Sequence, residues 1–185
     1  RLFGEIGSVV LFGFILLLTL LSIWLPLIKN FEIINEKYFE SLQLIPIIFI
    51  SYLFYTWYIL LMPSIFLNDK QNWSPAFRGA AAVVNIGLNI ILIPSFGIYG
   101  AAFSTLFAYF VMGLFLYFKN IKWMNIPVKY IQLILFLIIS SGFYYLSLHN
   151  TTMFKFILST IYLISSFFIL NYIISISELK QKILK

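Results

Sequence analysis

Long runs without a charged residue alternate with short polar segments along this chain. A helix needs about 20 apolar residues to cross a hydrocarbon core roughly 30 Å thick. A charged side chain at mid-bilayer costs at least about 2.5 kcal/mol, so we place the ends of the spans near charges. Six membrane-spanning helices are predicted, over residues 6–28, 41–68, 75–94, 98–118, 130–148 and 152–176.

The boundary between the third and fourth spans rests on turn residues. Residues 79–118 hold no charge, and forty residues are too many for one helix. The segment Pro-Ser-Phe-Gly at 94–97 is typical of a turn, because proline and glycine both interrupt helices. We therefore predict a helical hairpin that turns at this segment.

Composition agrees with this pattern. Of 185 residues, 62% are hydrophobic and 10% are charged, against roughly 25% charged in ordinary soluble domains. We predict an all-α polytopic membrane protein without a large water-soluble catalytic domain, and not an enzyme. Cysteine is absent and His149 is the single histidine, so we expect no disulfide, no metal site and no cofactor.

The charged residues predict an orientation. Twelve Lys and Arg outnumber six Asp and Glu, but they are scattered rather than clustered, so nucleic acid is not an expected partner. With alternating spans, nine basic residues fall on the side of the first residue and three on the other, which places both ends in the cytoplasm. The nine are Arg1, Lys70, Arg78, Lys119, Lys122, Lys129, Lys180, Lys182 and Lys185, and the three are Lys29, Lys37 and Lys155.

The most informative segment is 85–105, NIGLNIILIPSFGIYGAAFST. Its pattern N-x-x-L-N-x-x-L-I-P-x-x-G-x-x-G-A-A-x-x-T resembles the signature of polysaccharide and O-antigen flippases, in the multidrug/oligosaccharidyl-lipid/polysaccharide exporter superfamily. The matching residues are Asn85, Leu88, Asn89, Leu92, Ile93, Pro94, Gly97, Gly100, Ala101, Ala102 and Thr105.

The resemblance implies a place for this chain in a longer protein. The signature closes each six-helix lobe in that family, so residues 1–118 would supply four helices of the C-terminal lobe of a MATE-like two-lobe transporter. Residues 119–185 would add two further C-terminal spans and a cytoplasmic tail. Arg1 stands where a complete protein would begin with Met, and we expect an N-terminal lobe to precede it.

The resemblance also implies a function and partners. We expect a multi-pass protein of the bacterial cytoplasmic (inner) membrane that flips undecaprenyl-linked oligosaccharide during O-antigen, lipopolysaccharide or other surface polysaccharide biosynthesis. Its partners would be the lipid-linked oligosaccharide, membrane lipids and the missing lobe.

Polar residues within the spans are the candidate substrate-binding residues. Asn85 and Asn89 share a helix face, where their amides either bond between helices or line a hydrated cavity. Arg78 either meets a diphosphate or anchors the helix at the cytoplasmic surface. Tyr55 and Tyr58 lie in one narrow arc that either stacks on sugars or packs between helices.

Small residues of the signature have a packing role in this interpretation. Gly97, Gly100, Ala101 and Thr105 recur at spacings that let two membrane helices approach closely. Leu116, on the same helix, is expected to face lipid. Glu32, Glu36 and Glu40 are expected on a solvated outer turn, and His149 in a solvated loop.

Three alternatives stay open at the level of sequence. A multidrug/cation antiporter of the same superfamily shares the architecture. A membrane-embedded polysaccharide polymerase or ligase needs a long outer loop with catalytic Arg or His, whereas the longest loop here has about twelve residues, 29–40. A membrane scaffold without transport activity is the third.

Overall fold

The structure is a computed structural model that describes residues 2–31, 35–148 and 150–173. The chain forms two compact units. The terminal unit combines Arg1–Ile33 with Val128–Lys185, and the central unit is Ile34–Pro127. Every regular element in the described ranges is a helix.

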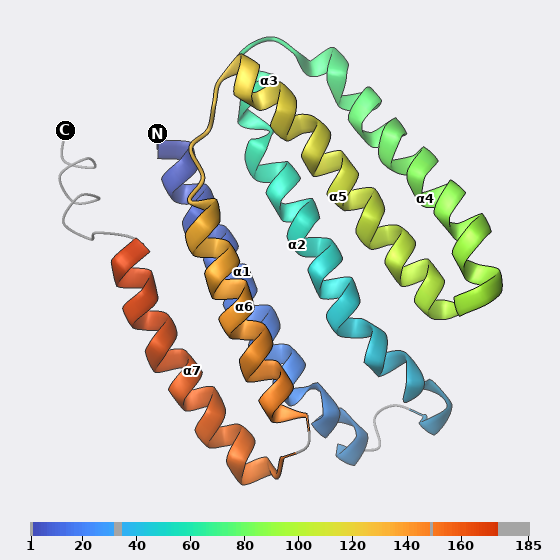
Figure 1. Cartoon of the computed structure of the whole chain (residues 1–185), viewed down its shortest axis with the longest axis vertical. Coiled ribbons are helices and arrows are strands. Elements are labelled where there is room, and N and C mark those ends of the chain that lie inside the picture. Colours follow the sequence, from blue (N-terminus) through green and yellow to red (C-terminus); the bar gives the residue numbers. More distant parts are fainter. Residues whose placement is uncertain (1, 32–34, 149, 174–185) are drawn as a thin grey trace. The chain divides into compact units, whose positions relative to one another are not determined.

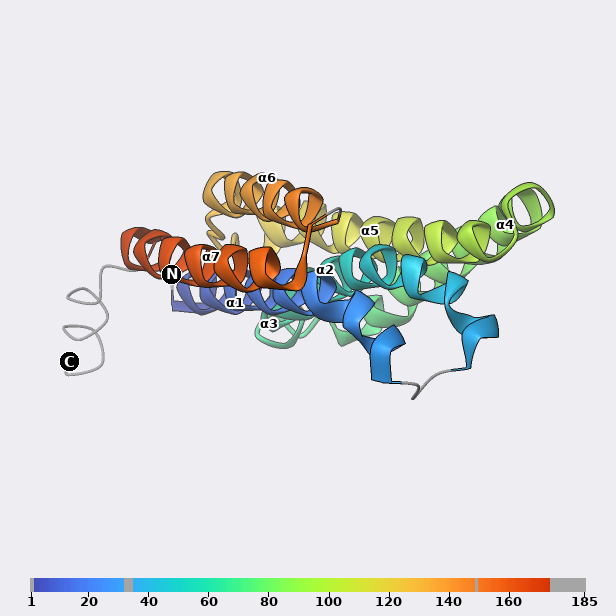
Figure 2. The ribbon, with the colours of Figure 1, turned by 90° about the horizontal axis from the view of Figure 1, so that it is seen from below.

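The terminal unit packs three long helices against one another (Figures 1 and 2). They are α1 (Leu2–Trp24), α6 (Tyr130–Ser147) and α7 (Thr152–Ile173), and the 3₁₀ helix η1 (Leu25–Phe31) follows α1. Helices α1 and α6 run in the same direction, since Ser8 Oγ accepts a hydrogen bond from the Lys129 amide and Phe12 stacks on Phe136. Helix α7 runs the opposite way, because Trp24 Nε1 at the end of α1 donates to Ser159 Oγ in its first half.

An aromatic stack holds the core of the terminal unit. The ring of Phe136 lies between Phe12, at a centroid distance of 4.0 Å, and Tyr162, at 5.8 Å. The Tyr162 hydroxyl is fully buried and shares a 2.7 Å hydrogen bond with Ser140 Oγ. A membrane interior offers polar groups no water, so this bond satisfies the hydroxyls inside the protein.

The central unit has α5 (Ile98–Trp123) between α2 (Ile45–Leu61) and α4 (Ser74–Phe96), as Figure 1 shows. Helices α2 and α5 run in the same direction and α4 runs in the opposite one. Short elements complete the unit: η2 (Glu36–Tyr38), η3 (Glu40–Leu44), α3 (Pro63–Phe66) and η4 (Gln71–Trp73). Pro46, Pro63 and Pro75 each occupy the first or second position of a helix, where the missing amide proton removes no hydrogen bond.

Glycines set the spacing of these helices. A Cβ added at Gly100 would lie 2.5 Å from the Leu92 carbonyl oxygen, so α5 packs against the backbone of α4 at this point. A Cβ at Gly113 would lie 2.7 Å from the Trp57 ring on α2. Each glycine therefore allows a close approach that a side chain would prevent.

The predicted hairpin turn lies in the predicted segment. Helix α4 includes Pro94 and continues to Phe96, two residues beyond its predicted end. The helix ends at Gly97, whose φ of +53° and ψ of −129° suit glycine alone. Glycine rather than proline thus makes the turn.

The described residues contain six helices long and apolar enough to cross a membrane, which confirms the all-α, six-span prediction. Their bounds differ in detail, because the second predicted span is broken at Met62, between α2 and α3, and α5 extends five residues past 118 to Trp123. The assignment of residues 1–118 to a C-terminal lobe and of residues 119–185 to two further spans and a tail came from the resemblance, and it stays a prediction. Residues 174–176, Glu32 and His149 lie outside the described residues.

The expectation that Leu116 faces lipid is wrong. Its side chain is 0% exposed. Ala108, Met112 and Leu116 follow one another at four-residue spacing and are all buried, so they share the packed face of α5. The apolar character of this helix on all sides hides which face is packed.

Candidate functional site

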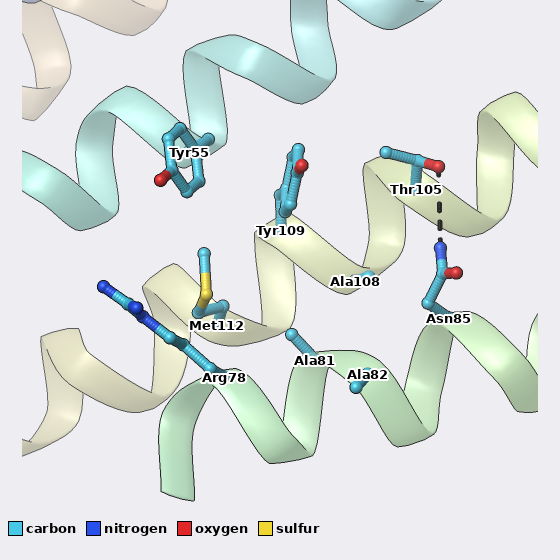
Figure 3. Close-up of a pocket in the computed structure, with 9 residues that line it drawn as sticks. All are labelled: Tyr55, Arg78, Ala81, Ala82, Asn85, Thr105, Ala108, Tyr109 and Met112. Carbon is cyan, nitrogen blue, oxygen red and sulfur yellow. Dashed lines mark hydrogen bonds between the residues drawn. The ribbon is translucent and has the colours of Figure 1, made fainter. Parts of the chain in front are cut away.

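The central unit contains a cavity of about 420 Å³ lined by α2, α4 and α5 (Figure 3). Polar side chains enter it from all three helices, although the helices themselves are long apolar segments. The lining residues are Tyr55, Arg78, Ala81, Ala82, Asn85, Thr105, Ala108, Tyr109 and Met112.

Two stripes of matching periodicity build most of the cavity. On α4 the lining residues stand at positions 78, 81, 82 and 85, and on α5 at positions 105, 108, 109 and 112. Both follow the i, i+3, i+4, i+7 spacing of a single helix face. Alanines occupy the middle of both stripes, and their small side chains leave the space that the polar residues border.

A chain of hydrogen bonds orients one amide in the cavity wall. Asn89 Nδ2 donates to Asn85 Oδ1 at 3.0 Å, Asn85 Nδ2 reaches Thr105 Oγ1 at 3.5 Å, and Thr105 Oγ1 donates to the Ala101 carbonyl at 3.1 Å. Figure 3 shows the link between Asn85 and Thr105. Asn89 does not line the cavity, but its hydrogen bond to Asn85 Oδ1 helps to fix the orientation of the Asn85 amide.

The opposite wall is aromatic. The rings of Tyr55 and Tyr109 lie 5.1 Å apart, and Tyr52 packs against both, at 6.4 and 6.0 Å. Tyrosine offers a flat apolar face together with a hydroxyl that bonds to water or to a ligand. This wall suits a ligand with both apolar and polar faces.

Arg78 supplies the positive charge of the cavity. It lies near the start of α4, and Figure 3 shows its side chain extending past Met112. No carboxylate pairs with it among the described residues, and none of the lining residues is Asp or Glu. With respect to the described residues, its guanidinium can meet an anion through its fork of N–H donors.

The structure brings together only part of the predicted set. Tyr55, Arg78, Asn85 and Thr105 line the same cavity. Tyr58 does not: its side chain is 1% exposed, and its hydroxyl is buried without a hydrogen-bond partner in the described part of the chain. Pro94, Gly97, Gly100, Ala101 and Ala102 form the turn and the start of α5. Substrate binding stays a prediction for the candidate substrate-binding residues, which are Tyr55, Tyr58, Arg78, Asn85 and Asn89.

Sequence reasoning missed Tyr109 and Met112, which also line the cavity. They follow Thr105 by four and seven residues, so the helical period would have found them once Thr105 was placed on an inner face. Ala81, Ala82 and Ala108 have no functional group that would mark them as binding residues in the sequence. They shape the cavity because their small side chains leave its space open. No group of three or more His, Cys, Asp or Glu that could hold a metal ion occurs in the described residues.

Comparison with known proteins identifies one membrane protein. Over 104 residues, which are 56% of this chain, the sequence is 32% identical to an uncharacterized membrane protein of Methanocaldococcus jannaschii. The match covers 20% of the length of that protein. Comparisons with protein-family profiles and with solved structures give no match. Together with the six apolar helices, the similarity identifies this chain as a multi-pass membrane protein.

Proposed function

We propose that this chain is part of a transporter that flips undecaprenyl-linked oligosaccharide across the bacterial cytoplasmic membrane for surface polysaccharide export. One observation carries the proposal beyond the resemblance of residues 85–105. A cavity within a membrane-spanning unit is lined by an arginine, an amide, a threonine hydroxyl and two tyrosines.

The chemistry of the cavity suits a glycan headgroup. Flipping moves a hydrated headgroup across roughly 30 Å of hydrocarbon, so the path must supply polar contacts in place of water. Asn85 and Thr105 offer an amide and a hydroxyl, and Tyr55 and Tyr109 offer flat rings against which a sugar can pack. The volume lies in the range of small-ligand sites, about 300–1,000 Å³, and holds part of an oligosaccharide at a time.

Arg78 is proposed to meet the diphosphate that joins the glycan to its lipid. Guanidinium groups bind phosphate oxygens through paired, charge-assisted hydrogen bonds. A hydrogen bond to a charged group contributes about 1.5–3 kcal/mol, so loss of Arg78 should weaken binding by at least one to two orders of magnitude, the effect of one such bond. Among the described residues, the lining contains no Asp or Glu, which favours an anionic ligand over the organic cation of an antiporter.

The cavity would form one wall of a larger path. Moving a headgroup between leaflets requires alternate access from two sides, which a second lobe would provide. Energy would come from an ion gradient or from substrate flux, and the polyprenyl tail would remain in lipid. These steps extend the proposal to the longer protein implied by the resemblance.

Gene replacement tests the proposal. In a strain from which the gene is deleted, the full-length protein with Arg78→Ala should accumulate to normal levels but restore surface polysaccharide poorly. Asn89→Leu should act in the same direction, because it removes the bond that orients Asn85. Lys70→Ala is the matched control, since Lys70 is basic and lies just before η4 but does not line the cavity.

The control separates the two interpretations of Arg78. Equal losses with Arg78→Ala and Lys70→Ala would assign Arg78 to membrane anchoring and remove it from the binding site. Full surface polysaccharide with both Arg78→Ala and Asn89→Leu would remove the cavity from the transport path. Normal glycan in the deletion strain itself would overturn the substrate class.

A further inference from the structure

A second cavity lies in the central unit, separate from the one described above. It has a volume of about 370 Å³ and lies where the start of α4 meets the end of α5. Its walls are almost entirely apolar except for one ammonium group. The lining residues are Trp73, Ala76, Phe77, Phe115, Phe118 and Lys119.

Aromatic rings form a fixed cluster at this cavity. Trp73 packs on Phe77 at 6.3 Å and edge-on to Trp123 at 5.9 Å, and Phe77 and Trp123 are 6.4 Å apart. Phe77 is buried, at 3% exposed, whereas Trp73 is 42% exposed. Tryptophans with one buried and one open side are typical of the boundary between hydrocarbon and headgroups. The cluster thus marks the headgroup level at this end of the unit.

Below that level the surface is apolar and open. Phe115 and Phe118 are 48% and 56% exposed, and both line the cavity. They precede Trp123 on α5 and therefore lie deeper along the helix than the tryptophans. A hydrocarbon chain is the ligand that such a surface fits in a bilayer.

The rim is positively charged. Lys119 Nζ lies 4.1 Å from the centre of the Trp73 ring, and no carboxylate pairs with it in the described part of the chain. Lys122, one helical turn further, is exposed. Basic pockets beside membrane helices attract anionic headgroups, at about 1 kcal/mol for each basic residue. Apolar walls under a cationic rim match a phospholipid with a net negative headgroup.

We propose that this cavity binds an anionic phospholipid of the surrounding bilayer. Its phosphate contacts Lys119 and Lys122, and one acyl chain lies against Phe77, Phe115 and Phe118. Lys119 and Lys122 are among the nine basic residues assigned to one side of the membrane, and that side is predicted to be cytoplasmic. This inference concerns a different surface from the glycan cavity and does not depend on the proposed function.

Photo-crosslinking in vesicles tests it. The full-length protein is reconstituted with phosphatidylglycerol or phosphatidylcholine carrying the same diazirine on one acyl chain, and adducts are mapped by mass spectrometry. We expect adducts on the exposed residues Phe115 and Phe118 to be several times more abundant with phosphatidylglycerol. Lys119→Gln should lower the phosphatidylglycerol adducts about fivefold, the factor that corresponds to roughly 1 kcal/mol. Lys119→Arg should retain them.

Lys37→Gln is the matched control. Lys37 Nζ lies 4.9 Å from the Tyr38 ring, so it makes the same kind of contact, but it does not line this cavity. Its removal should leave the adducts unchanged. Equal labelling by the two lipids, or a loss with Lys37→Gln as large as with Lys119→Gln, would overturn the anionic site. Absence of adducts with both lipids would show that another protein segment fills the cavity, which also overturns the proposal.

Discussion

Gly100 is the position at which one added methyl group tests the packing of α4 against α5 most sharply. An ideal Cβ there would lie 2.5 Å from the Leu92 carbonyl oxygen, 2.6 Å from its carbonyl carbon and 2.8 Å from the Ile93 nitrogen. Ordinary contact begins at about 3.4 Å, so the shortest distance is 0.9 Å too small. All three atoms belong to the backbone, which cannot move aside as a side chain can.

The expected cost follows from this overlap. Forcing extra atoms into packed space typically destabilises a protein by about 1–3 kcal/mol. The higher helix propensity of Ala relative to Gly opposes this loss by about 0.5–1 kcal/mol. The difference between these ranges is about 0–2.5 kcal/mol, so Gly100→Ala should lower the free energy of unfolding by roughly 1 kcal/mol. Gly100→Leu should lower it by roughly 3 kcal/mol or more, because its larger side chain must separate the two helices.

Thermal unfolding of the full-length protein in detergent, with the folded yield from size-exclusion chromatography, measures both effects. Gly87 on α4 provides the control, since a Cβ there meets nothing within 4 Å. Gly87→Ala and Gly87→Leu should keep the wild-type yield and should not lower the stability, since the gain in helix propensity, about 0.5–1 kcal/mol for Ala, is not opposed by crowding. Wild-type melting of Gly100→Leu would refute the close approach of α4 and α5.

Two further predictions concern burial and topology. Leu116→Ala should lower the free energy of unfolding by about 2–5 kcal/mol, because Leu116 is fully buried. Leu17→Ala should change it little, because the Leu17 side chain is 52% exposed. Equal losses of unfolding free energy for the two variants in chemical denaturation would contradict the packed face of α5. Single cysteines at the exposed positions Asn72 and Asn125 should resist an impermeant thiol reagent in intact cells, whereas one at Asn35 should react. Labelling at all three positions would contradict the predicted orientation.

The sequence predicts the helices well because charge and turn residues mark their ends. The cost of a charge in hydrocarbon is large enough to locate the spans, and six candidate spans are found. The hairpin turn is predicted to within a few residues, because Pro94 is the single proline in residues 79–118 and Gly97 follows it by three residues. The broken second span was less predictable, since Pro63 permits both a kink and a new helix start.

Which helix face is packed is much harder to predict. In a soluble helix, polar residues mark the outer face, but in a membrane helix both faces are apolar, and Leu116 was misplaced for this reason. Polar residues are better guides, because an amide in hydrocarbon needs a protein partner. Asn85 and Thr105 could thus be placed on inner faces, whereas the burial of Tyr58 depends on the packing of α2.

Flipping of a lipid-linked oligosaccharide by the purified full-length protein is the most direct test of the proposed function. Vesicles containing a fluorescent undecaprenyl-linked oligosaccharide are treated with a membrane-impermeant quencher, which reaches only the outer leaflet. With the wild-type protein, the quencher should remove more fluorescence than the outer leaflet alone contains, because labelled lipid from the inner leaflet is flipped outward. This additional loss should be slower with Arg78→Ala and should proceed at the wild-type rate with Lys70→Ala. Quenching that stops at the outer leaflet, as in protein-free vesicles, or equally fast flipping of a fluorescent phospholipid without a glycan, would contradict it.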